Sequence, residues 1–63
     1  MEDKEIKVMI VDDIPSLCHR YQDIFEHTQD MKVVSVAHNG YEAVLKSAVT
    51  RPDVILMDIE MES

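Results

Sequence analysis

Cysteine and long apolar runs are scarce or missing in this chain, and each absence removes a class of protein. Cys18 is the only cysteine, so the chain forms neither an internal disulfide nor a cysteine-built zinc site. No apolar run approaches the roughly 18 residues of a membrane span. The first five residues, Met-Glu-Asp-Lys-Glu, are charged where a signal peptide would be apolar. We therefore expect a cytoplasmic protein with no membrane partner.

Basic residues are also scarce. Thirteen acidic residues against six basic ones give a formal net charge of -7, which argues against direct binding of nucleic acid because no phosphate-backbone footprint is available. With 63 residues, the chain is expected to form one small domain, residues 1–63. At this size the free energy of burial and the entropy lost on ordering nearly cancel, so a bound metal or an oligomer would add needed stability.

The apolar residues that are present predict three short strands. Residues 7–11, Lys-Val-Met-Ile-Val, are rich in β-branched types and do not alternate with polar residues. That pattern is typical of a strand buried on both faces of a parallel sheet. Residues 33–37 and 54–57 are expected to form the second and third strands.

Two amphipathic helices are expected between these strands, because apolar residues recur there at spacings of three and four. The first begins at Pro15 and fades at His27, where a polar stretch follows. Its expected packing stripe consists of Ile14, Leu17, Cys18, Tyr21, Ile24 and Phe25. The second follows the turn His38-Asn39-Gly40 and closes at Arg51-Pro52. The apolar face with which the second helix is expected to pack is formed by Tyr41, Val44, Leu45 and Ala48.

The order strand, helix, strand, helix, strand with short connections predicts an α/β fold with a three-stranded parallel sheet. If the first strand lies in the middle, the order is 2-1-3, and right-handed crossovers place one helix on each face. The third strand, residues 54–57, then has an open apolar edge. We expect a homodimer through this edge, or by swapping of elements, to complete a doubly wound sheet.

Three acids follow the ends of neighbouring strands in this arrangement: Asp12, Asp13 and Asp58. The crevice where strand order reverses is the usual ligand site of open α/β sheets. Carboxylates gathered there repel one another unless a cation neutralises them, and Mg²⁺ suits oxygen ligands that leave room for phosphate. A carboxylate so placed can attack phosphorus. Any one of these acids can instead cap the next helix, as Asp13 would before Pro15.

The segments 8–13, 37–43 and 51–59 resemble the CheY-like receiver domain of two-component response regulators, in order and in spacing. The resemblance covers the whole chain but about the first half of such a domain, and implies half of a flavodoxin-like fold. It implies that Asp58 is the phosphoacceptor, that Asp12 and Asp13 are the acidic ligands of Mg²⁺ beside Asp58, and that the Glu60 backbone carbonyl completes the protein's share of the metal shell. The implied partner is a histidine kinase or phosphotransfer protein.

Residues 31–34 look most like receivers that carry a helix-turn-helix DNA-binding domain, which implies a regulator of transcription. The family's Ser or Thr after the fourth strand and its Lys after the fifth have no counterpart here, so we expect a truncated domain whose switching is impaired. One alternative is a self-associating structural half-domain without signalling activity. We expect that the chain is not an enzyme. The alternative is a metal-dependent phosphohydrolase, since Asp58-Ile59-Glu60 is similar to the acid-x-acid loop of haloacid-dehalogenase-like phosphatases.

Overall fold

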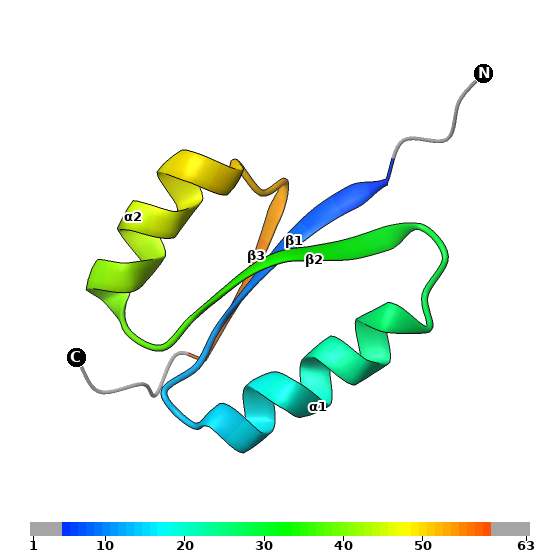
Figure 1. Ribbon diagram of the computed structural model, residues 1–63, viewed down its shortest axis with the longest axis horizontal. Helices are drawn as coiled ribbons and strands as arrows, with labels where there is room; N and C mark the ends of the chain where they lie inside the picture. Colours follow the sequence, from blue (N-terminus) through cyan, green and yellow to red (C-terminus); the bar gives the residue numbers. More distant parts are fainter. Residues whose placement is uncertain (1–4, 59–63) are drawn as a thin grey trace.

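A computed structural model describes residues 5–58, which form a parallel three-stranded sheet between two helices (Figure 1). The elements in chain order are β1 (Ile6–Val11), α1 (Pro15–Glu26), β2 (Met31–Ala37), α2 (Gly40–Thr50) and β3 (Val54–Met57). Strand β1 is central, and the order is β2-β1-β3. The predicted α/β class and the 2-1-3 strand order are confirmed.

Strand β1 carries the core on both of its faces. Its last four residues are buried: Val8, Met9, Ile10 and Val11. Because side chains alternate along a strand, Val8 and Ile10 pack with Cys18 of α1. Met9 and Val11 pack on the other face against Ala43 of α2. One helix therefore covers each face of the sheet, as the crossover rule predicts (Figure 1).

The pairing of β1 with β2 contains a bulge. It steps from Val8 opposite Val33 to Met9 opposite Ser35, so Val34 is the extra residue. Beyond the bulge, the Ser35 hydroxyl lies 3.0 Å from the Thr50 hydroxyl of α2. The bulge therefore gives β2 a polar anchor on the face that α2 covers.

Both ends of α2 are fixed by local hydrogen bonds. The Asn39 side chain accepts a bond from the Glu42 N–H at 2.8 Å, and the Glu42 carboxylate accepts one from the His38 N–H at 2.9 Å. This is close to a reciprocal capping box. The hydrogen bond from the His38 N–H is the main reason why the pKa of Glu42 is lowered, and the positive charge of Lys46 also lowers it. At the other end, Arg51 takes a left-handed conformation with φ of 50° and closes the helix.

The predicted packing face of α2 is wrong. Tyr41, Val44 and Leu45 are 76%, 68% and 52% exposed, and Ala48 is exposed as well. The face toward the sheet is formed by Ala43, Ser47 and Thr50. Small side chains let α2 approach the sheet closely, and the Ser35–Thr50 hydrogen bond satisfies the polar groups there. The larger apolar residues are left on the outer side of the helix.

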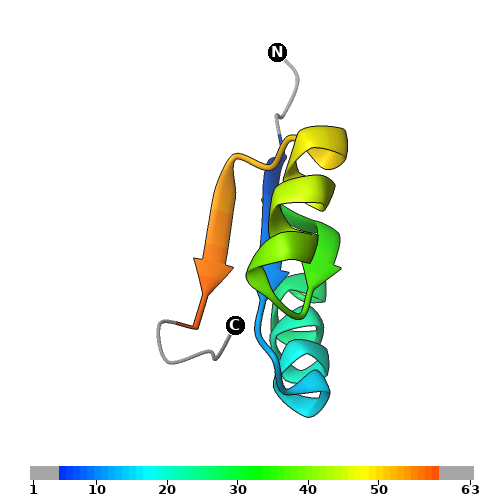
Figure 2. The same ribbon diagram turned by 90° about the vertical axis from the view of Figure 1, so that its left-hand side faces the viewer.

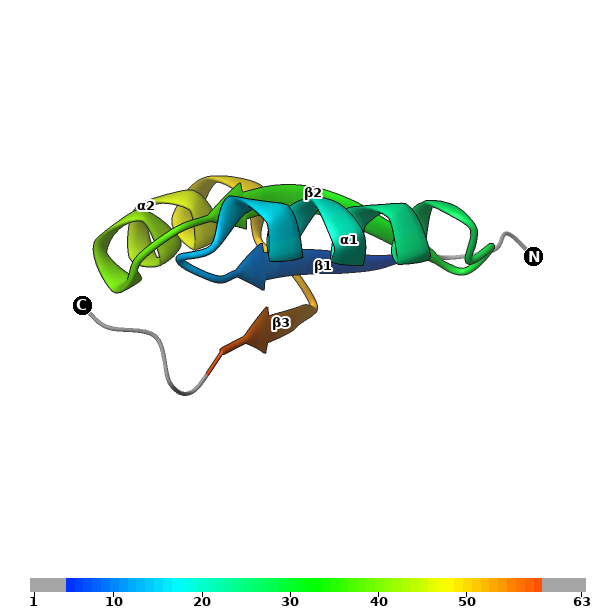
Figure 3. The same cartoon turned by 90° about the horizontal axis from the view of Figure 1, so that it is seen from below.

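Strand β3 is the least covered element. Its four residues are 37% to 49% exposed, and in Figures 2 and 3 it lies to one side of both helices. The open apolar edge expected of this strand is thus present in the described part of the chain. Within residues 5–58, no helix has the length and apolar content needed to cross a membrane.

Candidate metal and phosphoacceptor site

The residues that follow β1 and β3 continue the ladder of the sheet. The Asp12 N–H donates to the Ala37 carbonyl at 3.0 Å, and the Asp58 N–H donates to the Val11 carbonyl at 3.1 Å. These bonds fix both backbones at the same edge of the sheet. The two aspartates are therefore held by the strands themselves rather than by a separate loop.

Three carboxylates meet at this edge. Oxygen atoms of Asp12, Asp13 and Asp58 lie within 4.8 Å of one another. Asp12 is buried with 3% of its surface exposed, Asp13 is exposed, and Asp58 is half-buried. The structure thus brings together the three acids that the sequence selected. Three hard oxygen donors that are open to solvent on one side form a set that suits Mg²⁺ with retained waters.

Asp12 also shapes the turn into α1. Its carboxylate accepts a hydrogen bond from the Ile14 N–H at 3.0 Å, a local turn that aspartate side chains favour. Ile14 takes the N-cap position of α1 and provides no side-chain cap. The expected alternative role of Asp13 as the cap before Pro15 is therefore wrong, and Asp13 turns its carboxylate toward the acid cluster instead.

Cys18 of α1 also contacts the turn between β1 and α1. Its thiol donates to the Asp12 carbonyl at 3.4 Å, and its side chain is buried. Burial, followed by the negative charge of Asp12, raises the pKa of the Cys18 thiol. A thiol kept protonated in an apolar setting is a packing group. This role agrees with its place on the apolar stripe of the first helix.

A pocket of about 310 Å³ opens beside the acids, between α1 and β3. Asp12 and Asp58 lie at its polar end, and Leu17, Tyr21 and Leu56 form its apolar wall. Sequence reasoning assigned Leu17 and Tyr21 only to the packing stripe of the first helix. Nothing in their spacing indicates that they border the acid cluster, because that depends on how far β3 lies from α1.

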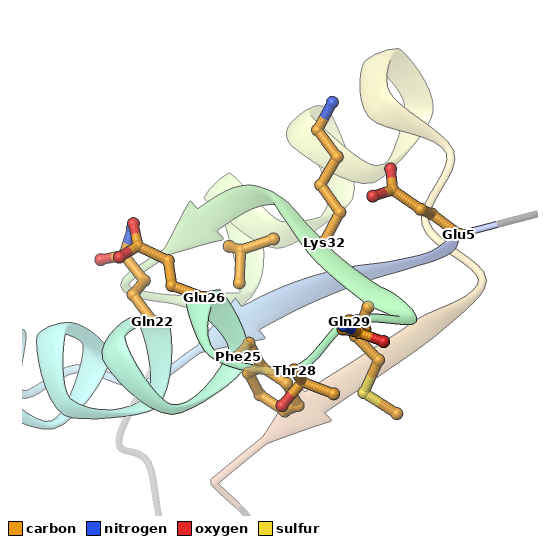
Figure 4. Close-up of a pocket in the computed structure, with 9 residues that line it drawn as sticks. Glu5, Gln22, Phe25, Glu26, Thr28, Gln29 and Lys32 are labelled. Atoms are coloured by element: carbon orange, nitrogen blue, oxygen red, sulfur yellow. The ribbon is translucent and has the colours of Figure 1, made fainter.

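A second pocket, of about 550 Å³, lies where the end of α1 meets the start of β2. Figure 4 shows its charged side chains, Glu5, Glu26 and Lys32, with their charged ends lying apart around the hollow. These groups do not converge on a common point. The pocket therefore has no arrangement comparable to the three acids.

Two other residues, Glu60 and His38, come shortly after the ends of β3 and β2 in the sequence. Glu60, the expected donor of a backbone carbonyl, lies outside the described residues. His38 follows β2, and its ring Nδ1 lies 3.5 Å from the Glu42 carboxylate. Its place in a turn next to α2 agrees with a turn residue rather than a member of the acid cluster.

Comparison with known families decides where this arrangement belongs. The family model of the response regulator receiver domain matches residues 8–63. The chain is a member of the receiver domain family. The predicted resemblance is thereby confirmed, and the segments around the acids are the ones on which it was based.

The relatives of this receiver chain include proteins named protein-glutamate methylesterase/protein-glutamine glutaminase. The protein from Thermotoga maritima is 48% identical over 97% of this chain and 18% of its own length. The protein from Caldanaerobacter subterraneus subsp. tengcongensis is 45% identical over 92% of this chain and 16% of its own length. The one from Vibrio cholerae is 48% identical over 89% of this chain and 15% of its own length.

The receiver chain thus spans less than a fifth of the length of these relatives. Their shared name is that of a methylesterase and glutaminase, so the expectation of a transcription regulator finds no support in them. No solved structure gives a significant match to the receiver chain.

Proposed function

We propose that this receiver chain accepts a phosphoryl group on Asp58, with Mg²⁺ bound by the carboxylates of Asp12, Asp13 and Asp58. The observation that carries the proposal is the gathering of the three carboxylates within 4.8 Å at the ends of β1 and β3. Membership of the receiver family supports it independently. The Glu60 carbonyl is proposed as a further metal ligand on the basis of the resemblance alone.

The donor set fits the proposed ion. Carboxylate oxygens are the ligands that Mg²⁺ takes, usually one or two together with waters and substrate phosphate oxygens. A bound Mg²⁺ would neutralise charge on the three carboxylates and on the incoming phosphoryl group. The bond from the Ile14 N–H to the Asp12 carboxylate fixes the orientation of this proposed ligand, which supports the proposal.

The proposed reaction is a transfer between two proteins. A carboxylate oxygen of Asp58 attacks the phosphorus of a phosphohistidine on a histidine kinase or phosphotransfer protein. A P–O bond forms, the P–N bond breaks, and its electron pair remains on the imidazole nitrogen, which takes up a proton. A small acyl phosphate could serve as donor in the same way. The chain is then a phosphoacceptor module of the cytoplasm rather than an enzyme acting on its own substrate.

We further propose that residues 1–63 are the amino-terminal part of a receiver whose output is an activity of the methylesterase and glutaminase kind. This proposal rests on identities of 45% to 48% to proteins of that name, and it replaces a role in transcription. Reading the gene beyond Ser63 tests it directly. A following segment similar to those relatives would support the proposal, and a DNA-binding segment would contradict it.

Phosphorylation itself can be tested on the chain. Incubation with acetyl phosphate and Mg²⁺ is expected to add one phosphoryl group by mass, and Asp58→Asn should remove this gain. Asp13→Asn should weaken the binding of millimolar Mg²⁺, as measured by the change in amide chemical shifts on titration. Asp23→Asn is the matched control, because Asp23 is an exposed aspartate on α1 outside the cluster. Release of inorganic phosphate in many turnovers would instead favour the phosphohydrolase.

A second candidate is the self-associating half-domain, and the exposure of β3 favours it. Val54, Ile55, Leu56 and Met57 are all more than a third exposed on an edge strand. Pairing of β3 with the same strand of a second copy would cover this edge. Light scattering tests it, since Ile55→Lys should shift such a dimer to monomer.

A further inference from the structure

The outer face of α2 is the most continuous apolar surface on either helix. Five exposed residues form it: Tyr41, Val44, Leu45, Ala48 and Val49. Their spacing of i, i+3, i+4, i+7 and i+8 aligns them on one side of the helix. The opposite side packs on the sheet through Ala43. Figure 2 looks onto the outer side of α2, and no other described element covers it.

We propose that this outer face of α2 pairs with the same face of a second copy of the chain, antiparallel across a two-fold axis. An isologous interface needs a surface that is complementary to itself. If the axis passes between Val44 and Leu45, the largest residue of the face, Tyr41, lies opposite the smallest, Ala48, of the second copy. Val44 and Leu45 then lie at the centre. The face therefore has the size pattern that an antiparallel helix pair requires.

The charges beside the face have the same self-complementary order. Glu42 and Lys46 lie on one flank of α2, on either side of its midpoint, and are 39% and 45% exposed. Within one copy they lie 3.9 Å apart and the Lys46 ammonium donates to the Val36 carbonyl of β2, so contacts between copies would add to this existing pair. A two-fold axis at the midpoint of α2 places the flank of both helices on the same side of the dimer, and the two flanks then run in opposite directions. Glu42 of each copy then falls within about 2 Å, measured along the helix, of Lys46 of the other, given a rise of about 1.5 Å per residue. The dipoles of the two antiparallel helices point in opposite directions, and their interaction also favours the dimer.

The area of the face indicates how strong such a dimer is. The four largest residues are 52% to 82% exposed. Side chains of this size have on the order of 150 to 200 Å² each, so roughly 450 Å² per copy and about 900 Å² in total would be buried. That is below the roughly 1,200 to 2,000 Å² of stable specific interfaces and falls in the range of weak, transient ones, so we expect a dissociation constant on the order of 0.1 mM or weaker. The antiparallel arrangement also leaves the two acid clusters at opposite ends of the dimer, both accessible.

Sedimentation of the 63-residue chain between about 10 µM and 1 mM tests the proposal. We expect a monomer–dimer equilibrium whose dissociation constant rises at least tenfold in Leu45→Glu. Ile24→Glu is the matched control, because Ile24 is 56% exposed on α1, on the other side of the sheet. It should leave the constant unchanged, as should Ile55→Lys on β3. Circular dichroism checks that each variant is folded.

A single cysteine supplies a positive test that does not depend on losing a contact. Val44→Cys places a thiol beside the proposed axis, so mild oxidation should give a disulfide-linked dimer, whereas Ile24→Cys should stay monomeric. Cys18 is buried and does not compete. A monomer at 1 mM, a dimer insensitive to Leu45→Glu, or equal cross-linking of the two cysteine variants would overturn the proposal. Loss of the dimer only in Ile55→Lys would assign it to the β3 edge instead.

Discussion

Helix α2 can pack on the sheet through its small residues or through its apolar stripe, and two alanine substitutions distinguish these orientations. One is at Met9, beneath the helix, and the other is at Leu45, on its outer side. Met9 is completely buried beneath α2, beside Val11 and Ala43. Truncating a buried side chain of this size costs about 2 to 5 kcal/mol, because the transfer free energy is lost and a cavity remains. A 63-residue domain has only roughly 3 to 9 kcal/mol in total. Met9→Ala should therefore leave the chain close to unfolding.

Leu45→Ala should have a much smaller effect. Leu45 is 52% exposed, so about half of the roughly 1.5 to 3 kcal/mol for full burial of leucine is at stake. Alanine is also the better helix former and recovers part of that loss. We expect a net cost of less than about 1 kcal/mol.

Urea unfolding followed by circular dichroism, at a few micromolar protein to avoid association, measures both changes. With an m-value of about 1 kcal/mol per molar, the midpoint should fall by roughly 2 M or more in Met9→Ala and by less than about 1 M in Leu45→Ala. Equal losses, or a larger loss in Leu45→Ala, would mean that α2 packs through its apolar stripe and would refute the orientation described above.

Three further outcomes follow from single contacts. Arg51→Gly should stabilise the chain by about 0.5 to 1 kcal/mol in thermal unfolding, because glycine removes the left-handed strain at φ of 50°, whereas Arg51→Ala should not. Asp12→Ala should cost about 1 to 2 kcal/mol by orphaning the Ile14 N–H, and Asp12→Asn less than half as much, so comparison of the two melts separates folding from metal binding. His27 has a raised pKa, chiefly because its ring lies 2.8 Å from the Asp23 carbonyl. The protonated His27 ring should therefore stabilise the folded chain fully below pH 6.5, and this contribution should disappear as pH rises through the raised pKa. An NMR titration that gave an ordinary pKa for His27 would contradict this.

The sequence predicts the sheet well because its strands are chemically unambiguous. A short apolar run that is rich in β-branched residues and does not alternate is typical of a strand buried on both faces, and the last four residues of β1 are buried as expected. Strand order predicts that Asp12 and Asp58 lie at one edge of the sheet, since they continue neighbouring strands. It does not predict the direction of the Asp13 carboxylate, which the turn into α1 directs toward the other two.

The orientation of α2 could not be predicted in the same way. The helix has an apolar stripe and a face of small residues, and hydrophobic periodicity selects the stripe. The small face is the one that packs, because Thr50 bonds to Ser35 on a strand that has been shifted by the bulge at Val34. A bulge is not encoded by a local pattern that distinguishes it from a regular strand. The two pockets likewise depend on how far the strands lie from α1.

The bulge at Val34 also gives the two borders of the sheet different properties. A bulge twists an edge strand and interrupts its row of free backbone groups, which is one way proteins prevent further strands from adding. Strand β3, on the other border, is regularly paired with β1 along its length. Growth of the sheet is therefore favoured on the β3 side. A chain of this kind that added strands through β3 would close as a pair and stop, whereas two regular borders would allow an endless fibril.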